Sequence, residues 1–473
     1  MKQFYELSVL MLGLFLVGQA RAQQSFTLEQ CIEHALKNAI SAQNAEIDQR
    51  IASARVKETV GLGLPQISGS VSIQHNETLR RFFGRYNDTP GAFSFFPAGI
   101  PGAVNGDILA AQNFFQLKSS GDAGVSINQL IFNGSYLVGL QAANAYKDLA
   151  TKSSVQTNEQ IIQSVTKAYY GVLINKERVG LFASNISRVD SLLRHTKALY
   201  KNGFAESIDV DRIQVALNNL ETERDKFLNL NELGLALLKF QMNYPLEQPI
   251  AVIGSIQDVK VPALETYLEG WDYKNRPDYQ VLEANHKLQQ LNVKNKFAEG
   301  VPSISAFANL GYFTQSPGVG GLFKTNSNVA DLGTVGPDKW YGYSQFGVTL
   351  NVPVFSGLSR TYRVQQEKLN LLKIQNGFIN LKNGIDFEIK QSTIQFQNGL
   401  KTLSTQKANM ELAGNVARIT KIKYEQGVGS NFEVVEAEDA LKQAQVNYYN
   451  ALFDVMVAKV DLDKAYGKLL PTN

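Results

Sequence analysis

The sequence predicts a mixed α and transmembrane-β fold, in which a few membrane-spanning strands are combined with unusually long helices. Three observations predict it: two stretches of over a hundred residues without proline, four segments that alternate between apolar and polar residues, and the same order of elements in both halves of the 473-residue chain. With 44% hydrophobic residues, the chain is also too apolar to be disordered.

The N-terminus has the pattern of a secretory signal peptide over residues 1–22. Lys2 precedes an apolar stretch at residues 7–17, and an Ala-Arg-Ala cleavage pattern follows. An uncleaved membrane anchor is the alternative, but this apolar stretch is shorter than the roughly 20 residues that a spanning helix needs. The sequence therefore predicts export from the cytoplasm.

Composition excludes several classes of function. The formal net charge is only +3, which provides no basic surface for nucleic acid. Cys31 is the only cysteine, so neither a disulfide framework nor a thiolate metal site is expected, and a buried helical position is the simplest interpretation. The histidines lack metal-ligand spacing, at His34, His75, His195 and His286. Because no catalytic motif is present either, the sequence predicts neither an enzyme nor a bound cofactor or metal.

The proline-free stretches, residues 102–244 and 354–470, predict long helices, because proline breaks a helix whereas a single glycine costs only about 1 kcal/mol. In the second stretch a small residue recurs every seven positions, and a large apolar residue lies four positions after each. The small positions are Ala437, Ala444, Ala451, Ala458 and Ala465, and the large ones are Leu441, Tyr448, Val455, Leu462 and Leu469. This seam predicts a left-handed coiled coil. The first stretch has a weaker copy at Ile213, Leu217, Leu220 and Phe227.

Four alternating segments predict strands at about 64–75, 123–132, 301–313 and 344–355. Each has roughly the eleven residues of a tilted membrane-spanning strand, with one apolar face and one face rich in Ser, Gln, Asn and Thr. Four strands cannot close a barrel, and an open sheet edge in lipid leaves backbone groups unpaired at a cost of several kcal/mol each. Several copies of the chain are therefore expected to complete one barrel.

The two halves repeat one another. The first repeat, residues 23–250, and the second, residues 251–473, each read as a helix, two strands and a long helical hairpin. The hairpin tips are expected near 200–209 and 424–433, where Tyr200 matches Tyr424, Gly203 matches Gly427 and Asp209 matches Glu433. The chain is thus interpreted as an internal duplication.

These elements, in this order, resemble the TolC-like outer membrane efflux protein family. The similar segments are the opening "FTLEQCIEHALKNAISAQNA", the strand starts "PQIS" and "PSIS", the strand ends "LIFNG" and "PVFSG", and the two Tyr-x-x-Gly turns. The resemblance covers essentially the whole mature chain in the family's order. Each motif alone is weak, but the ordered and duplicated set is specific.

The resemblance implies a homotrimer in the outer membrane of a Gram-negative bacterium. Three chains would form a twelve-stranded barrel in outer membrane lipid, continued by an α-helical tunnel through the periplasm. The implied function is the exit duct of a tripartite efflux or type I secretion-like system, with a periplasmic adaptor and an inner-membrane transporter as partners. Nothing in the sequence predicts whether the cargo is a drug, a metal, a peptide or a protein.

The resemblance also implies functional residues at the hairpin tips. Glu433 and Glu436 occupy the positions of two acids that line the periplasmic constriction, and their spacing places both on one helix face. The alternative is that they are ordinary solvated acids at a helix start. For the gate and the adaptor contact, the implied tip residues are Tyr200, Gly203, Asp209, Arg212, Tyr424, Gly427 and Gly429.

Gly429 departs from the family, which often has an arginine there that latches the entrance. Asp209, Asp211 and Arg212 are a possible substitute pairing. The rival interpretation of the whole chain is a periplasmic coiled-coil adaptor or scaffold, which would use the heptads but would not need four strands of membrane-spanning length.

Overall fold

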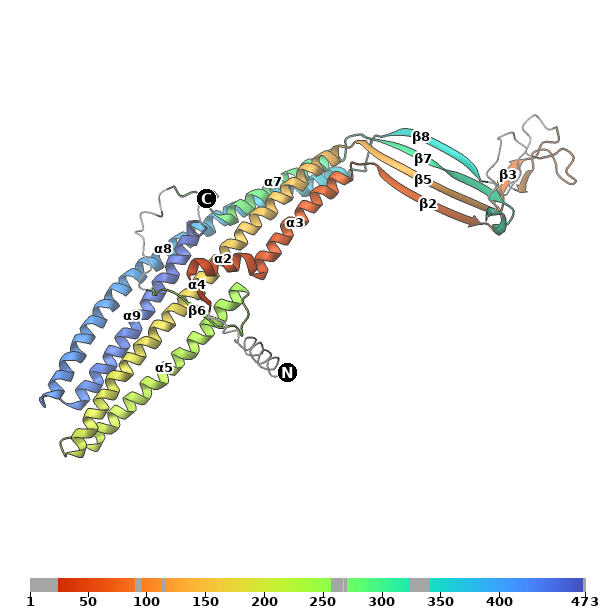
Figure 1. Cartoon of the computed structure of the whole chain (residues 1–473). Helices are drawn as coiled ribbons and strands as arrows, with labels where there is room; N and C mark the ends of the chain where they lie inside the picture. Colours follow the sequence, from red (N-terminus) through yellow and green to blue (C-terminus); the bar gives the residue numbers. More distant parts are fainter. Residues whose placement is uncertain are drawn as a thin grey trace, which may run out of the picture. The chain divides into compact units, whose positions relative to one another are not determined.

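The computed structural model describes residues 24–89, 96–112, 115–256, 267, 270–323 and 340–470 (Figure 1). The predicted signal peptide at residues 1–22 lies outside them. The chain divides into two compact units, each drawn from both halves of the sequence. The helical unit consists of Met1–Ser53, Ala145–Gln289 and Leu369–Asn473, and the sheet unit consists of Ala54–Asn144 and Gln290–Lys368.

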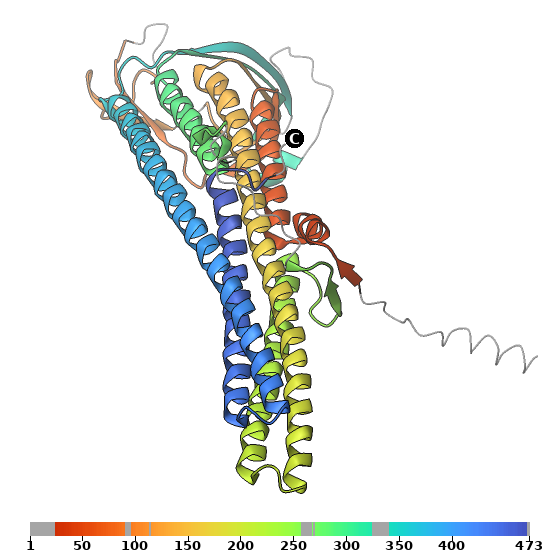
Figure 2. The same cartoon turned by 90° about the vertical axis from the view of Figure 1, so that its left-hand side faces the viewer.

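Two long helical hairpins dominate the helical unit. Helices α4 (Gly134–Lys201) and α5 (Ser207–Met242) form the first hairpin, and α8 (Ser359–Glu425) and α9 (Asn431–Ala465) form the second. Figures 1 and 2 both show the two hairpins lying side by side. The shorter helices are α2 (Leu28–Asn38), α3 (Ile40–Gly61) and α7 (Pro277–Ala298). Among the described residues, no helix combines the length and the apolar character that crossing a membrane requires.

The predicted heptad seam of α9 is buried along the helix. Its alanines and the large residues Leu441, Val455 and Leu462 are all in the core, whereas Tyr448 is only partly buried. Gly399 of α8 permits this close packing, because a Cβ atom there would lie 3.0 Å from a methyl carbon of Val455. Leu469 is the exception, since α9 ends at Ala465.

The largest core cluster joins α2 to the long helices. Cys31 is fully buried in it, as the sequence predicts, and burial raises the pKa of its thiol to about 12. The cluster lies beside a two-stranded parallel sheet of β1 (Gln24–Phe26) and β6 (Ile250–Val252). This sheet pairs the starts of the two halves, and its three-residue strands are too short for alternation to reveal them.

The sheet unit contains one antiparallel sheet in the order β2-β5-β7-β8. Its strands are β2 (Gln66–His75), β5 (Ser119–Phe132), β7 (Ser303–Ser316) and β8 (Tyr341–Asn351). The register aligns the predicted apolar positions in rows, one of which contains Ile67, Ile127, Ala308 and Phe346. The next row, on the other face, contains Ser68, Ser126, Asn309 and Gln345, and the hydroxyl oxygens of Ser68 and Ser126 lie 2.7 Å apart.

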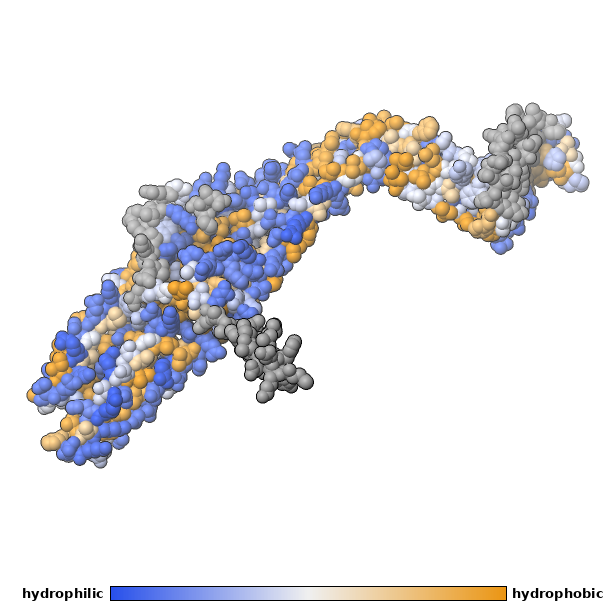
Figure 3. Space-filling view, viewed as in Figure 1, coloured by the Kyte–Doolittle hydropathy of each residue, from blue (hydrophilic) through white to orange (hydrophobic). Residues whose placement is uncertain are grey.

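The two-faced character predicted for the strands is therefore confirmed. The apolar face of the sheet is exposed, and Val71, for example, is 75% exposed. Figure 3 shows apolar residues gathered over the strands. A soluble protein rarely exposes a contiguous apolar patch of this kind, so this face is a contact surface. Strands β2 and β8 are the two edges of the sheet.

Three further details differ from the sequence prediction. The last strand ends at Asn351, before Val352 and Val354, because Pro353 has no N–H to donate to the ladder. The opening helix of the first half is two helices, since Ala39 has an extended ψ of 136°. A short hairpin of β3 (Arg81–Arg85) and β4 (Ile108–Gln112), which alternation over five residues does not reveal, follows β2.

Candidate functional site

The first predicted tip is a glycine-terminated turn between α4 and α5. Gly203 has a φ of +79°, which a residue with a Cβ rarely adopts. Its N–H donates to the carbonyl of Tyr200 at 3.1 Å, and the N–H of Phe204 donates to the carbonyl of Leu199 at 2.9 Å. These two bonds satisfy the last carbonyls of α4 in a Schellman arrangement.

The second tip, between α8 and α9, has the same geometry. Gly427 has a φ of +74°, and its N–H donates to the carbonyl of Tyr424 at 3.0 Å. The N–H of Val428 donates to the carbonyl of Lys423 at 3.0 Å. The matched Tyr-x-x-Gly motifs are therefore helix-ending motifs of one type, used twice.

Each tip also starts the next helix with a side-chain cap. At the first tip, the carboxylate of Asp209 accepts the N–H of Glu206 at 3.2 Å. At the second, the hydroxyl of Ser430 accepts the N–H of Glu433 at 3.2 Å. The acid that follows each turn thus lies in the first turn of a helix, where a negative charge is favoured by the helix dipole.

Gly429 lies where a side chain has little room. A Cβ atom there would approach the Cβ of Lys423 and the backbone nitrogen of Tyr424 at 3.1 Å each. Because the second of these atoms belongs to the backbone, any larger residue would require the last turn of α8 to shift by a few tenths of an ångström. The turn therefore leaves little room for a larger side chain at position 429.

Side chains of the two tips contact one another. The hydroxyls of Tyr424 and the fully buried Thr196 lie 2.9 Å apart, and the ring of His195 packs edge-on against Tyr424. The side-chain amide of Asn431 donates to the carbonyl of Asp209 at 2.8 Å. Tyr424 therefore joins α8 to α4, and Asn431 joins α9 to α5. Tyr200 is exposed and forms no contact of this kind within the described part of the chain.

The suggested pairing of Asp209 with Arg212 is present but weak. Their charged atoms are 3.9 Å apart within α5, and the Arg212 guanidinium lies 5.8 Å from the ring centre of Phe432 on α9. An ion pair of this length within one helix, with Arg212 partly exposed, contributes little. Asp211, the other suggested partner, is exposed.

A stronger connection, which the sequence does not reveal, lies further along the hairpins. Arg188 of α4 forms an ion pair with Glu438 of α9 at 3.1 Å, and the Glu438 side chain is only 11% exposed. Arg188 also donates to Asn185 at 2.7 Å, and Asn185 donates to Gln445 of α9 at 3.0 Å. We call these four residues the α4–α9 latch. The two pairs that link α4 to α9 are 250 and 260 residues apart in the sequence, and only the folded chain brings them together.

The acids after the second tip fall into two groups. Glu438 is paired with Arg188, and Asp439 is paired with Lys442. Glu433 and Glu436 are exposed, and neither carboxylate forms an ion pair with another described residue. The two positions that the resemblance singles out are thus the two free carboxylates of this segment.

Glu436 lines a groove of about 310 Å³ between α4, α5 and α9. The apolar lining includes Val189 and Leu192 of α4, Leu220 of α5 and Phe432 of α9. This groove offers apolar surface with a charged rim, a suitable chemistry for binding another helix.

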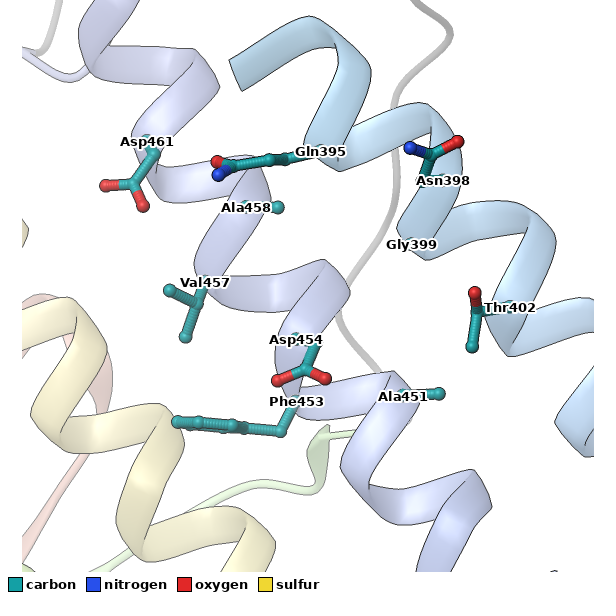
Figure 4. Close-up of a pocket in the computed structure, with 10 residues that line it drawn as sticks. All are labelled: Gln395, Asn398, Gly399, Thr402, Ala451, Phe453, Asp454, Val457, Ala458 and Asp461. Carbon is teal, nitrogen blue, oxygen red and sulfur yellow. The ribbon is translucent and has the colours of Figure 1, made fainter. Parts of the chain in front are cut away.

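A second groove, of about 460 Å³, lies beside the contact of α8 with α9 in the middle of the second hairpin (Figure 4). Figure 4 shows Gln395, Asn398 and Thr402 on the α8 side, with Asp454 and Asp461 on α9. Asp461 also accepts a hydrogen bond from Gln163 and forms an ion pair with Lys167, both of which are on α4. The groove is therefore lined by polar and apolar side chains, the latter including Phe453 and Val457. Within the described ranges, no group of His, Cys, Asp and Glu side chains is arranged to hold a metal ion.

These features define a class of protein that has a sheet with one exposed apolar face and two helical hairpins whose tips contact each other. Residues 273–468 match the family model of the outer membrane efflux proteins. The probable efflux pump outer membrane protein TtgC of Pseudomonas putida is 24% identical over 324 residues, which cover 66% of this chain and 61% of TtgC. The outer membrane protein TolC of Vibrio cholerae is 20% identical over 351 residues, which cover 73% of this chain and 76% of TolC.

The fold agrees with these matches. The crystal structure of the outer membrane protein VceC from Vibrio cholerae superposes with a TM-score of 0.68 at 15% identity, covering 93% of this chain and 96% of VceC. The sequence and the fold are thus both similar to those of the outer membrane efflux proteins, and the chain is assigned to the outer membrane of a Gram-negative bacterium, with a large periplasmic portion. The similar proteins are outer membrane channels, not enzymes. The match to TtgC, the first of the relatives, spans about three fifths of that protein's length.

Proposed function

We propose that this chain forms the outer membrane exit duct of a tripartite export system, which receives substrates from an inner-membrane pump. The observation that carries this proposal is the sheet with an exposed apolar face and a polar face rich in Ser and Asn. The apolar face suits lipid, and the polar face suits a water-filled lumen. TtgC is named as part of an efflux pump, whereas a type I secretion-like role has no separate support.

The duct is proposed to be a homotrimer with a twelve-stranded barrel. One chain supplies four strands and leaves the edges of β2 and β8 unpaired, which lipid does not tolerate. The helices support the same assembly, because α5 exposes Leu233, Leu237 and Phe240 along one stripe. A neighbouring copy would cover both the strand edges and this stripe.

An internal duplication is proposed as the origin of the fold. The element order supports it, since the first repeat (residues 23–250) and the second (residues 251–473) each contain two sheet strands followed by a helical hairpin. The matched helix-ending motifs at Gly203 and Gly427 support it further.

The periplasmic gate is proposed to lie at the hairpin tips. Glu433 and Glu436 would form two rings of three carboxylates in the trimer, which would favour cations and repel one another in a closed entrance. The α4–α9 latch and the Tyr424–Thr196 bond would hold the second hairpin against the first in the closed state.

A periplasmic adaptor is the proposed partner at these tips. The groove beside Glu436 and the exposed side chains of Tyr200, Phe204 and Val428 provide apolar surface for a helical hairpin of such a protein. An adaptor or scaffold role for this chain itself is not favoured, because the apolar face of the sheet would then be exposed to water in the periplasm.

Fractionation and bilayer recording test the proposed duct. The chain should remain in the outer membrane fraction after urea extraction and should form pores in planar bilayers. The purified protein should have three times the mass of the mature chain, which is the 52.3 kDa of the full chain minus the signal peptide. Release by urea as a soluble monomer without pore activity would overturn the proposal and would favour the adaptor.

A further inference from the structure

The β3–β4 hairpin has two different faces. Its register places Arg81 opposite Gln112, Phe83 opposite Ala110 and Arg85 opposite Ile108. Because side chains alternate along a strand, Arg81, Phe83 and Arg85 share one face with Ile108. We call these four residues the Arg–Phe–Arg face.

The loop between β3 and β4 covers the opposite face. Phe96 packs so closely on Gly84 that a Cβ atom there would lie 2.9 Å from the ring. Tyr86 is buried, and its hydroxyl donates to Asp88 at 3.0 Å and accepts the N–H of Ile100 at 3.1 Å. In contrast, Phe83 is 76% exposed and Ile108 is 69% exposed. The Arg–Phe–Arg face therefore lacks an internal cover among the described residues.

The charge on this face is positive. Strand β3 contains two arginines, strand β4 contains none, and neither strand contains a carboxylate. Neither arginine forms an ion pair within the described ranges. Asp107, in the adjoining loop, accepts the N–H of Val104 at 2.8 Å, as Asp88 accepts the hydroxyl of Tyr86. The nearby carboxylates are thus engaged in the loop.

The position of the hairpin in the sheet unit identifies its surroundings. Helix α3 leads into β2 and helix α4 follows β5, while the hairpin connects the other ends of these two strands (Figure 1). In an outer membrane protein with a periplasmic helical portion, that end of the sheet faces the cell exterior. The lipid there is the outer leaflet, whose glycolipid carries phosphate groups on its lipid A disaccharide.

We propose that the Arg–Phe–Arg face binds the phosphorylated lipid A headgroup of the outer leaflet. The planar guanidinium groups of Arg81 and Arg85 match the geometry of phosphate oxygens, and both are always charged. Phe83 and Ile108 contact the apolar part of the same lipid, since aromatic side chains between charged ones favour a membrane interface.

Binding of purified lipid A tests the proposal. The full-length protein in detergent is titrated with diphosphoryl lipid A, and the bound lipid is counted by native mass spectrometry. The double variant Arg81→Gln/Arg85→Gln should bind lipid A with an affinity at least about tenfold lower, because two charge-assisted contacts are lost. Arg81→Lys/Arg85→Lys should retain part of the affinity, because it keeps the charge and loses the fork geometry.

The matched control removes the same charge elsewhere. Lys401 and Lys407 are exposed on α8, so Lys401→Gln/Lys407→Gln should bind lipid A like the wild type. Circular dichroism and the assembled mass of each variant verify the fold. Because the readout is lipid binding, a failure of the proposed duct in bilayers would leave this result unaffected.

Three outcomes would overturn the proposal. The first is equal binding of lipid A by the wild type and the double variant. The second is equal binding of dephosphorylated lipid A, which would make the contact purely apolar. The third is equal binding of phosphatidylglycerol, which would assign the face to anionic lipid in general.

Discussion

Glu159 of α4 is a carboxylate that is only 3% exposed, and its Oε1 atom has no hydrogen-bond partner among the described residues. Four charged groups from other elements surround it: Arg276 and Asp278 at the start of α7, Glu388 of α8 and Lys464 of α9. Burial raises the pKa of Glu159 to about 7, even though the charge of Arg276 opposes this shift. The side chain is therefore largely protonated in the folded protein below that pH.

Replacing Glu159 should change how stability depends on pH. The folded pKa lies above the ordinary value of 4.5, so folding retains a proton that the unfolded chain releases as pH rises from about 4.5 to about 7. The wild type should lose up to about 1.4 kcal/mol per pH unit across this window relative to Glu159→Gln, and no more above it. The advantage of the variant in thermal unfolding, followed by circular dichroism, should thus grow from pH 5 to pH 7. A difference that is constant with pH would contradict this.

The Arg276 cluster also shows what sequence reasoning misses at the scale of residues. Arg276 is buried and donates to Asp278 at 2.7 Å, to Glu388 at 2.8 Å and to the carbonyl of Ala465 at 3.1 Å. Its partner Glu388 is 112 residues away, and no local pattern marks a buried arginine. The burial of Cys31, by contrast, is the simplest interpretation of the only cysteine in the sequence, and it is confirmed.

At the scale of elements, the α4–α9 latch should control the width of the entrance. Glu438→Gln removes a charge from a mostly buried pair and leaves Arg188 without its partner. Because Arg188 is about one third exposed, the loss should be about 1 kcal/mol, enough to shift a closed–open equilibrium roughly fivefold. Single-channel recording should show a larger open fraction in the variant.

A second ion pair on α4 provides the control for the latch. Arg194 pairs with Asp190 within the same helix, and both side chains are well exposed. Asp190→Asn removes one negative charge, as Glu438→Gln does, but breaks no contact between the hairpins, so its open fraction should equal that of the wild type. An equal effect of both variants would mean that Glu438 acts through overall charge.

The free carboxylates of α9 should set ion selectivity. Glu433→Gln/Glu436→Gln removes six negative charges from a trimer and should reduce the preference for cations and the block by multivalent cations, as measured by reversal potentials in planar bilayers. Glu411→Gln, on an exposed part of α8, should leave both properties unchanged. Unaltered selectivity of the double variant would exclude these residues as the constriction.

Long elements with a regular repeat could be predicted from the sequence, whereas short or interrupted elements could not. The seam of α9 and the faces of the four long strands follow from repeats of seven and two residues, and both are present in the structure. The break at Ala39 and the hairpin of β3 and β4 depend on one backbone angle and on a loop folding back, respectively. The tip turns are an intermediate case, since their glycines predict where the turns occur but not which side chains of the two tips contact each other.

At the scale of the whole molecule, the exposed apolar residues indicate that one chain is incomplete. They lie along the face of the sheet and also in stripes on helices, such as Leu412, Val416 and Ile419 of α8. In the proposed duct, lipid would cover the first group. Helices outside the membrane meet water, so the second group requires another protein surface.

The stripe on α5 should therefore be needed for assembly rather than for folding of the chain. Phe240 is 72% exposed, and Phe240→Glu adds a charge that a neighbouring subunit would have to bury, at a cost far above that of an exposed charge. Cross-linking and mass photometry should show fewer trimers, while circular dichroism should show unchanged helix content. Asn229→Glu adds the same charge at another exposed position of α5 and should assemble normally. Normal assembly of Phe240→Glu would show that the stripe faces water in the trimer, and would leave the edges of β2 and β8 to hold the copies together.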